Sequence, residues 1–486
     1  MKIIILGAGR VGQSVAESLV SEQNGITVID TNARALRDLE SRFDLRGVVG
    51  NGIDPQVLAE AGAKDTDLLI ACASMDETNL VCCKIAQAMF DIPTRIARVR
   101  SSSFAADDPV LGKDGFAVDR IICPEESVTN YISKLIEYPE AMQVRSFAGG
   151  RAALASVRAR AGAPAVGLPI AQVRERMPAL AMRIVAIYRR FMDEPDRFVR
   201  CDGNTRIEPG DEVFMLAATA HVPEALKAIN LPEGRSSRPV YRIMIAGGRQ
   251  LSLRLAKKLP QTQGRFHVKI IEHNAQHCLS LASALPAEVL VLEGDATDEN
   301  LLEEEGIEEV DLFLALTDDD EDNIMSSLLA KRMGARRVLA LINRRAYADL
   351  MHGTQIDIAL SPAQAMLGEF LAYVRRGDVQ AVHSLRRGVA EALEIVARGD
   401  RKSSRVVGRK VEELRLPEDV HIGLIVRGIP EGKTCEEVAG LPLATEVIIP
   451  RSNTVIESGD HVVFFLPNKR LVRNVENLFR VSATFF

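Results

Sequence analysis

The sequence predicts an α/β protein in which a Rossmann-like parallel-sheet domain, followed by a smaller α+β domain, occurs twice. In each half, short apolar runs alternate with amphipathic segments, the order that builds a parallel sheet with helices on both faces. A glycine-rich pattern at 7–12 returns in altered form at 247–252. Shorter β-like runs and turns complete each half, which predicts a second, smaller kind of domain.

Matched segments extend the repeat well beyond the glycines. The apolar run at 67–71 corresponds to the run at 311–315, and the turn at 50–52 corresponds to the turn at 294–296. Both pairs occur in the same order and at the same spacing. Matches of this kind indicate an internal duplication.

The strands and helices of each half can be placed in order. Apolar runs predict strands at 2–6, 26–30, 46–49, 66–73, 94–100 and 118–123. The intervening helices are expected to begin near Val11, Asn32, Asp54, Glu77 and Phe104. The second half repeats this order, with strands near 241–246, 266–272, 288–292, 310–316, 336–342 and 357–360.

The pattern changes after two further helices, expected at 125–138 and 363–376. In each of the two segments that follow, a Val-Gly pair is expected to start a short helix, and a Gly-Asp turn precedes a strand. The pairs begin at Val166 and Val407, and the turns begin at Gly210 and Gly459. The expected domains are a first N domain (1–140), a first C domain (141–230), a second N domain (240–378) and a second C domain (379–486), with a linker at 231–239.

The composition argues against several classes of protein. A formal net charge of −6 is unlike that of a general nucleic-acid binder. No run of about 18 apolar residues occurs, so no segment is expected to span a membrane. The seven cysteines form no C-x-x-C pair, which favours reduced core cysteines in a cytosolic protein. The segment 145–206 has twelve arginines and no lysine, and a membrane surface, an acidic partner or plain solvent can each account for it.

The first glycine pattern has the context of a dinucleotide site, because it follows a strand and opens a helix. It consists of Gly7, Ala8, Gly9, Arg10, Val11 and Gly12. Gly7 permits a tight turn, Gly9 lets the backbone approach a pyrophosphate, and Gly12 allows the helix to pack closely. The helix N-terminus offers free N–H groups to the phosphates.

An acidic residue, Asp30, ends the next predicted strand. Its carboxylate can accept hydrogen bonds from an adenosine ribose and would repel a 2′-phosphate, which favours NAD over NADP. Arg10 would lie unfavourably in the first helical turn without an anion, so a phosphate contact is preferred there over plain solvation.

Four further residues lie within predicted strands or just after them. Asn51 either adopts a left-handed turn conformation or faces the nucleotide. Ala73 and Ser74 end the fourth strand, where small residues let a ligand approach. Arg98 either reaches the adenine or ribose or makes a surface ion pair.

The second glycine pattern is altered. Arg249 replaces the middle glycine and Ser252 the third, while Glu272 keeps the acidic position. Weak or altered nucleotide binding is therefore expected in the second N domain. The acidic run 318–322 is interpreted as a helix start rather than a cation site. His273 and His277 have a spacing that can bind a metal, but no third ligand is evident, so no metal site is assigned.

Signatures of catalysis are missing from the sequence, which has no G-x-S-x-G, no P-loop and no H-E-x-x-H motif. A nucleotide motif that is duplicated without a catalytic constellation favours sensing over chemistry. We therefore expect that the protein is not an enzyme. Two alternatives stay open: an NAD-dependent dehydrogenase with a divergent substrate domain, and a purely structural scaffold.

The glycine motif with Asp30, the turn at 50–52, Arg98 and the duplicated domain order together resemble the TrkA family of peripheral Trk potassium-uptake subunits, which are built from two tandem RCK (regulator of potassium conductance) units. The resemblance covers essentially the whole chain. It implies that NAD is contacted by Gly7, Ala8, Gly9, Arg10, Val11, Asp30, Asn51, Ala73, Ser74 and Arg98.

The same resemblance implies the cofactors and partners. The N domains of the family bind NAD⁺ or NADH, with ATP and ADP as further ligands. The subunits form a ring, a homotetramer, on a membrane potassium translocator of the TrkH or TrkG type. The chain would then be cytoplasmic and peripherally associated with the inner face of the cell membrane.

Overall fold

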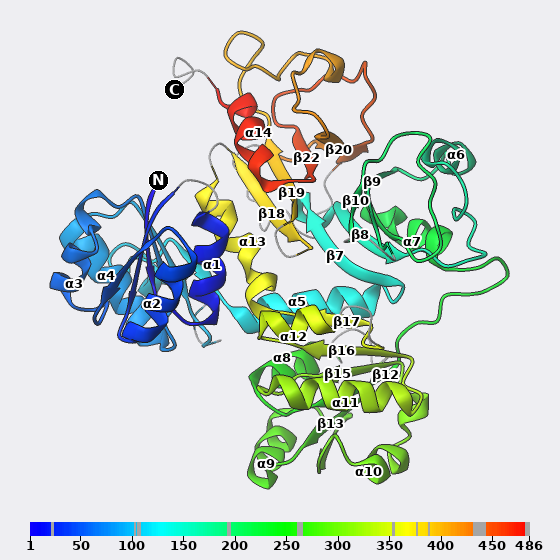
Figure 1. Cartoon of the computed structure of the whole chain (residues 1–486), viewed down its shortest axis with the longest axis horizontal. Helices are drawn as coiled ribbons and strands as arrows, with labels where there is room; N and C mark the ends of the chain where they lie inside the picture. The colour runs from blue at the N-terminus through cyan, green and yellow to red at the C-terminus, as the bar shows by residue number, and fades with distance from the viewer. Residues whose placement is uncertain are drawn as a thin grey trace. The chain divides into compact units, whose positions relative to one another are not determined.

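The computed structural model describes residues 1–20, 24–101, 104, 108–191, 196–259, 266–351, 355–375, 378–386, 389–430 and 444–481. The chain folds into two compact units, Met1–Asn130 with Tyr241–Phe370 and Tyr131–Val240 with Leu371–Phe486. The first unit holds two six-stranded sheets and the second unit holds two five-stranded sheets (Figure 1). The predicted fold class, duplicated parallel-sheet domains each followed by a smaller α+β domain, is confirmed.

The sheet of the first N domain is parallel and has the strand order β3-β2-β1-β4-β5-β6. Its strands are β1 (Lys2–Leu6), β2 (Gly25–Asp30), β3 (Arg46–Val49), β4 (Leu68–Ala71), β5 (Thr94–Arg98) and β6 (Arg120–Ile122). Its helices are α1 (Arg10–Val20), α2 (Ala33–Arg42), α3 (Pro55–Glu60), α4 (Asp76–Phe90) and α5 (Pro124–Glu137). Helices α3 and α4 pack on one face of this sheet and α1 lies on the other (Figure 1).

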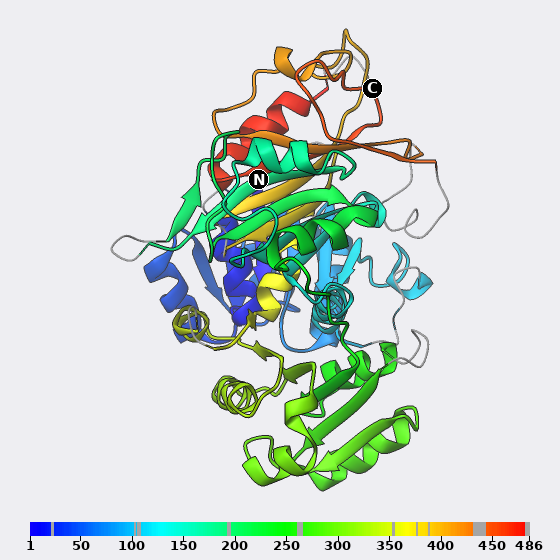
Figure 2. The same ribbon diagram turned by 90° about the vertical axis from the view of Figure 1, so that its right-hand side faces the viewer.

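The second N domain repeats this topology, with the strand order β14-β13-β12-β15-β16-β17. Its strands are β12 (Arg242–Ala246), β13 (His267–Glu272), β14 (Val289–Glu293), β15 (Leu312–Ala315), β16 (Arg337–Leu341) and β17 (Ile358–Leu360). Its helices are α8 (Gln250–Lys258), α9 (Ala275–Ala284), α10 (Glu299–Glu304), α11 (Asp320–Arg332), α12 (Arg345–Leu350) and α13 (Pro362–Val374). The strands and helices of this domain are seen from a second side in Figure 2.

Two expectations for the first N domain need correction. The run 66–73 forms a strand only over Leu68–Ala71, because polar side chains hold the chain on both sides of it. Asp67 accepts a hydrogen bond from Lys2 N (2.7 Å), and the Ala73 N–H donates to the Asn79 side chain (2.8 Å). The helix expected from Phe104 is absent at Phe104 itself, and residues 102–103 and 105–107 lie outside the described residues.

The sheets of the C domains are antiparallel. The first has the order β10-β9-β11-β8-β7 and the second β18-β19-β22-β20-β21. The strands of the first are β7 (Ala141–Phe147), β8 (Ala152–Arg158), β9 (Met182–Arg189), β10 (Arg197–Val199) and β11 (Glu212–Ala218), with helices α6 (Ile170–Arg176) and α7 (Val222–Asn230). The strands of the second are β18 (Val379–Leu385), β19 (Ala390–Val396), β20 (His421–Arg427), β21 (Glu446–Ile448) and β22 (His461–Leu466), with helix α14 (Val472–Phe479).

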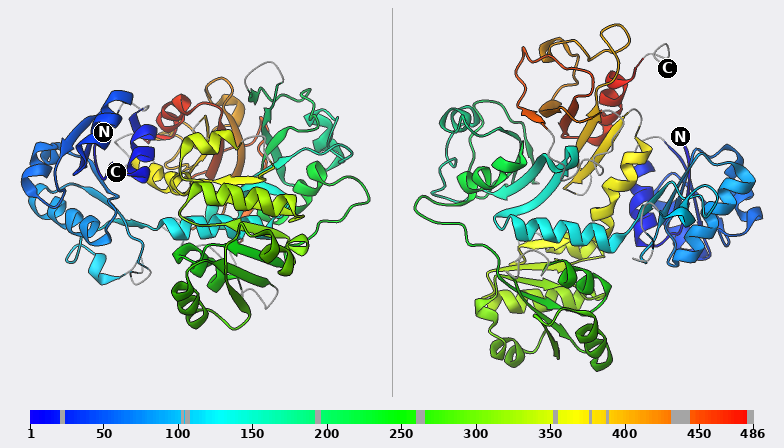
Figure 3. Two further views of the ribbon diagram at one scale, coloured as in Figure 1. Left: turned by 60° about the horizontal axis from the view of Figure 1, so that its bottom comes forward. Right: turned by 180° about the vertical axis from the view of Figure 1, so that it is seen from behind.

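The predicted turns of the C domains are confirmed, but one of their helices is not. Gly210 and Gly459 have positive φ values of 93° and 86°, and each lies two residues before its strand, β11 or β22, begins. The first Val-Gly pair leads into α6, whereas the pair at Val407 leads only into the 3-10 turn Val411–Glu413. The linker at 231–239 contains no helix or strand, and its trace can be followed from α7 to β12 in Figure 3.

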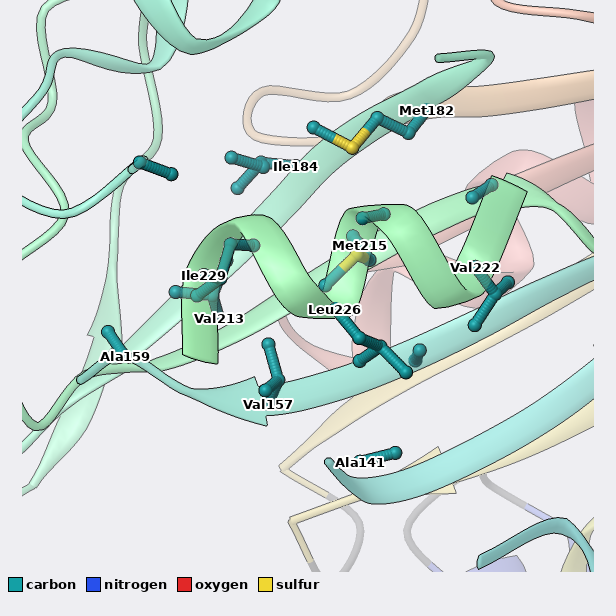
Figure 4. Close-up of a cluster of buried hydrophobic side chains, with 14 of the residues drawn as sticks. Ala141, Val157, Ala159, Met182, Ile184, Val213, Met215, Val222, Leu226 and Ile229 are labelled. Atoms are coloured by element: carbon teal, nitrogen blue, oxygen red, sulfur yellow. The ribbon is translucent and has the colours of Figure 1, made fainter. Parts of the chain in front are cut away.

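Each C-domain sheet packs on its partner sheet through one face. The apolar core between them includes Phe147, Phe214, Leu424 and Phe465. Gly423 is needed here, since a Cβ on it would lie 2.0 Å from Leu216 Cδ1. On the other face of the first sheet, α7 contributes Val222, Leu226 and Ile229 to a separate core (Figure 4).

The arginine-rich segment 145–206 is partly committed to internal contacts. Arg189 makes a bidentate pair with the buried Asp211, and the second C domain repeats it with Arg427 and Asp460. Arg183 donates to two backbone carbonyls of the second C domain. These arginines stabilise turns and join the two C domains, so they are not part of a solvated basic face.

The described cysteines are free thiols, and Cys72, Cys82, Cys83 and Cys123 are buried, as expected for core cysteines. Burial raises the pKa of the Cys72 and Cys82 thiols to about 12, so both are protonated at neutral pH. Cys435 lies outside the described residues. Among the described helices, none has both the length and the apolar character needed to cross a membrane.

Candidate nucleotide site

The glycine loop of the first N domain has the geometry that its sequence predicts. Gly7 follows β1 with a φ of +105°, and a Cβ on it would lie 3.0 Å from the backbone of Cys72. A Cβ on Gly12 would lie 1.9 Å from the Gly7 carbonyl oxygen. A Cβ on Gly9 would meet nothing within 4 Å. The loop is therefore packed at its two ends and open in the middle, where α1 begins.

Asp30 joins this loop to the end of β2. Its Oδ2 accepts a hydrogen bond from Ala8 N (2.6 Å), and its Oδ1 accepts one from Asn32 N (2.7 Å). A carboxylate oxygen can accept a second hydrogen bond, so both oxygens keep acceptor capacity. Because Asp30 is only partly buried, a pair of hydroxyl groups can reach it.

Arg98 ends β5 and brings a positive charge to the same edge of the sheet. Its Nη1 lies 3.4 Å from the Ala73 carbonyl oxygen, and its Nε is buried without a hydrogen-bond partner among the described residues. Burial, and then the nearby Arg100, lower the pKa of Arg98. An anion at this edge would satisfy the remaining donors and offset the cost of burying the charge.

Asn79 orders the crevice edge, a role that the sequence analysis missed. Its buried side chain accepts from Ala73 N (2.8 Å) and donates to the carbonyl oxygens of Ala73 (3.1 Å) and Arg98 (2.9 Å). It therefore joins the ends of β4 and β5. The signal in the sequence was an asparagine at the same helical position in both halves, since Asn323 makes the corresponding contacts in the second N domain.

One of the two predictions for Asn51, a left-handed turn conformation, is wrong, because the backbone φ of Asn51 is not positive. Its Oδ1 accepts from Ile53 N (3.2 Å), which forms a local side-chain turn. The flanking glycines serve packing. A Cβ on Gly50 would lie 2.6 Å from Val57, and one on Gly52 would lie 2.4 Å from Leu6.

Most of the predicted site residues meet at one edge of the sheet, where the parallel strands end. The loop, Asp30, Ala73 and Arg98 are linked by the contacts described above, and Ser74 follows Ala73 on the same edge. Arg10 and Asn51 are exposed, and within the described residues no hydrogen bond or ion pair joins either side chain to the other site residues. The strand order reverses at β1 and β4, which is where α/β sheets bind ligands.

The acidic run of the second N domain is structural, as predicted. Asp319 caps α11 by accepting from Asp322 N (3.0 Å). Asp320 is buried and accepts from the backbone N–H groups of Asn343 and Arg344. The two histidines of this domain lie near one carboxylate, with His273 Nδ1 3.2 Å and His277 Nδ1 3.9 Å from Glu272 Oε1.

Comparison with known proteins agrees with the fold. The TrkA-N domain family matches residues 3–124 and 243–362, and the TrkA-C domain family matches residues 154–230 and 401–479. Among solved structures, the GsuK RCK domain is similar with a TM-score of 0.57, 17% identity, and coverage of 98% of this chain and 94% of that chain. The GsuK channel bound to NAD is similar with a TM-score of 0.55, 17% identity, and coverage of 98% and 78%.

Curated relatives match over the whole length of both chains. The Trk system potassium uptake proteins TrkA of Halomonas elongata and Vibrio alginolyticus are each 46% identical to this chain over 486 residues, and that of Haemophilus influenzae is 43% identical. In all three comparisons 100% of each chain is covered. The chain therefore belongs to the TrkA family of Trk system potassium uptake proteins.

Proposed function

We propose that the chain is the cytoplasmic, nucleotide-binding regulatory subunit of a Trk-type potassium uptake system. It binds NAD⁺ or NADH in the first N domain and gates a membrane potassium translocator through a change in ring conformation. The observation that carries this proposal is the edge of the first N-domain sheet where the strands end. An open loop lies there with a partly exposed carboxylate and with a partly buried arginine whose Nε has no hydrogen-bond partner among the described residues.

The residues of this crevice fit a dinucleotide. Asp30 would accept the hydroxyls of the adenosine ribose, and the pyrophosphate would lie over Gly9 at the N-terminus of α1. Arg98 and Arg10 would supply positive charge to the phosphates. Asn51, Ala73 and Ser74 complete the set at the strand ends. The solved structure of the GsuK channel bound to NAD supports the choice of ligand. ATP and ADP contain the same adenosine and phosphate groups that these residues would contact.

The domain division proposed from the sequence, 1–140, 141–230, 240–378 and 379–486, suits this function. Each N domain leads directly into a C domain through one helix, α5 or α13. The protein would assemble as a homotetrameric ring at the inner face of the membrane. The names of the relatives favour this regulatory function over the dehydrogenase alternative.

Residues next to the first site contact the second N domain, which offers a route for transmitting the occupancy of that site. Arg254 of α8 donates from Nη2 to the Arg100 carbonyl oxygen (3.1 Å), and its Nη1 lies 3.9 Å from Glu126 of α5. Arg100 is two residues beyond Arg98, and its N–H donates to Asp76 at the start of α4 (2.9 Å). If the end of β5 at Arg98 moved, the Arg100 carbonyl oxygen, which accepts a hydrogen bond from Arg254, would therefore move with it.

Replacing Arg254 by alanine is expected to weaken the coupling but not the binding. Loss of one charged hydrogen bond at a partly exposed site should reduce the nucleotide-dependent change in potassium uptake about fivefold. The Kd for NAD, measured by calorimetry, should stay within about threefold of wild type. Lys257→Ala, an exposed change on the same helix, is the control. An unaltered nucleotide response in Arg254→Ala would exclude this route.

The proposed function is tested by potassium uptake in cells that depend on this chain for it. Asp30→Ala should reduce nucleotide-dependent uptake to the level of cells without the protein, because the ribose acceptor is lost. The control is Asp44→Ala, which removes an exposed carboxylate in the same domain. Wild-type uptake in the Asp30 variant would contradict the proposal.

A further inference from the structure

The second N domain keeps the scaffold of a dinucleotide site. Gly247 follows β12 with a φ of +95°, as Gly7 follows β1. Glu272 accepts from Gly248 N (2.7 Å) and Asn274 N (2.9 Å), the same two contacts that Asp30 makes in the first copy. The backbone frame is thus preserved, and the two crevices can be compared position by position.

The middle of the second loop is filled by a side chain of the protein. Arg249 stands where the first loop has Gly9, and its guanidinium forms an ion pair with Asp318, which stands where the first copy has Ser74. The pair therefore bridges the loop after β12 and the loop after β15, across the path that a pyrophosphate would take. Both side chains are more than half exposed, so the ion pair adds little to the stability of the fold. It nevertheless lies between the two loops, and Asp318 neutralises the positive charge that Arg249 adds.

The ribose acceptor of the second crevice is also covered. Glu272 is only 3% exposed, whereas Asp30 is partly open. Gly248 replaces Ala8, and a Cβ on Gly248 would lie 2.4 Å from Leu281 Cδ1 and 3.0 Å from Glu272 Oε2. The missing methyl group lets Leu281 and the longer glutamate fill this space, so ribose hydroxyls have no access to the carboxylate.

The charge around the second crevice is reversed. Leu341 ends β16 where Arg98 ends β5, and Gln250 stands in place of Arg10. Asp295 stands in place of Asn51. At these aligned positions, the first copy has Arg10 and Arg98 with the carboxylate of Asp30. The second copy has Arg249 with the carboxylates of Glu272, Asp295 and Asp318, which disfavours an anionic ligand.

The helix that would receive the phosphates differs as well. Ser252 stands in place of Gly12, where a Cβ would lie 1.9 Å from the carbonyl oxygen of the first loop glycine. Its Oγ is buried and has no hydrogen-bond partner among the described residues. Helix α8 therefore cannot pack against its loop as closely as α1 does.

We infer that the second N domain is closed to dinucleotides by its own residues, so that each chain binds one NAD. This inference rests on the proposed function of the first site and specifies its stoichiometry. The second N domain then serves as a partner that responds to the first site, through α8 and Arg254.

The test is calorimetric titration of the full-length protein with NAD⁺, with Asp30→Asn and Glu272→Gln as variants that keep the side-chain shape. One NAD per chain is expected for wild type, one per chain with a Kd within twofold for Glu272→Gln, and at least a thirtyfold weaker Kd for Asp30→Asn. Two sites per chain in wild type, falling to one in Glu272→Gln, would overturn the inference while leaving the proposed function intact. No binding by wild type would contradict the proposed function itself.

Discussion

Gly9→Arg is expected to abolish dinucleotide binding while the protein stays folded. The position has open space, since a Cβ there would meet nothing within 4 Å. The arginine side chain would instead fill the path of the pyrophosphate, as Arg249 does in the second copy. We expect affinity for NAD to fall at least a hundredfold, or about 3 kcal/mol.

The measurement is calorimetric titration with NAD, beside the circular dichroism spectrum of the variant. Gly25→Arg is the matched control, because Gly25 begins β2 at the end opposite Asp30 and a Cβ there would come no closer than 4.0 Å to any neighbour. The control should bind like wild type. If Gly9→Arg also bound NAD with wild-type affinity, the pyrophosphate would not lie over this loop.

Glu391→Ala is expected to cause a large loss of stability in the second C domain. Glu391 accepts two hydrogen bonds from Arg375 Nη2, at 3.0 and 2.8 Å. The two side chains are 1% and 2% exposed, so alanine would leave the arginine charge buried. Glu476 is 4.0 Å from the Arg375 Nε and compensates only in part. The expected cost is about 3–5 kcal/mol.

Urea unfolding followed by circular dichroism measures this effect. Glu412→Ala, which removes an exposed ion pair with Lys410, should change the free energy of unfolding by less than about 1 kcal/mol. The double variant Arg375→Met/Glu391→Leu should recover part of the loss, because both charges of the pair are removed and only the Glu476 carboxylate is left without its arginine. If Glu391→Ala lowered the free energy of unfolding by less than about 1 kcal/mol, the ion pair between Arg375 and Glu391 would not be needed for stability.

The parallel sheets were predictable from the sequence because each strand is a short apolar run between polar segments. The same pattern placed the ends of β1 and β3 but not those of every strand, since some strand ends depend on side chains from elsewhere in the chain. Asp67 bonds to Lys2, and Asn79 bonds to Ala73 and Arg98. Periodicity carries no signal for contacts of this kind.

Whether each copy of the site is open to a nucleotide was only partly predictable from the sequence. The replaced glycines indicated a weaker second site, but the partner of Arg249 is 69 positions away, and local sequence does not reveal it. The burial of Glu272 likewise depends on Leu281 and on the missing methyl group of Gly248. The pairing of the two C-domain sheets through Gly423 and Leu216 was not predictable at all, because it joins distant segments.

The most direct test of nucleotide binding in the first N domain is a thermal-shift measurement with NAD⁺, NADH, ATP and ADP on wild type and on Asp30→Ala. A ligand that binds the native state raises the melting temperature by mass action. We expect a rise with NAD⁺ or NADH in wild type and none in Asp30→Ala. An equal rise in both proteins, or no rise in wild type with any of the four nucleotides, would contradict the account.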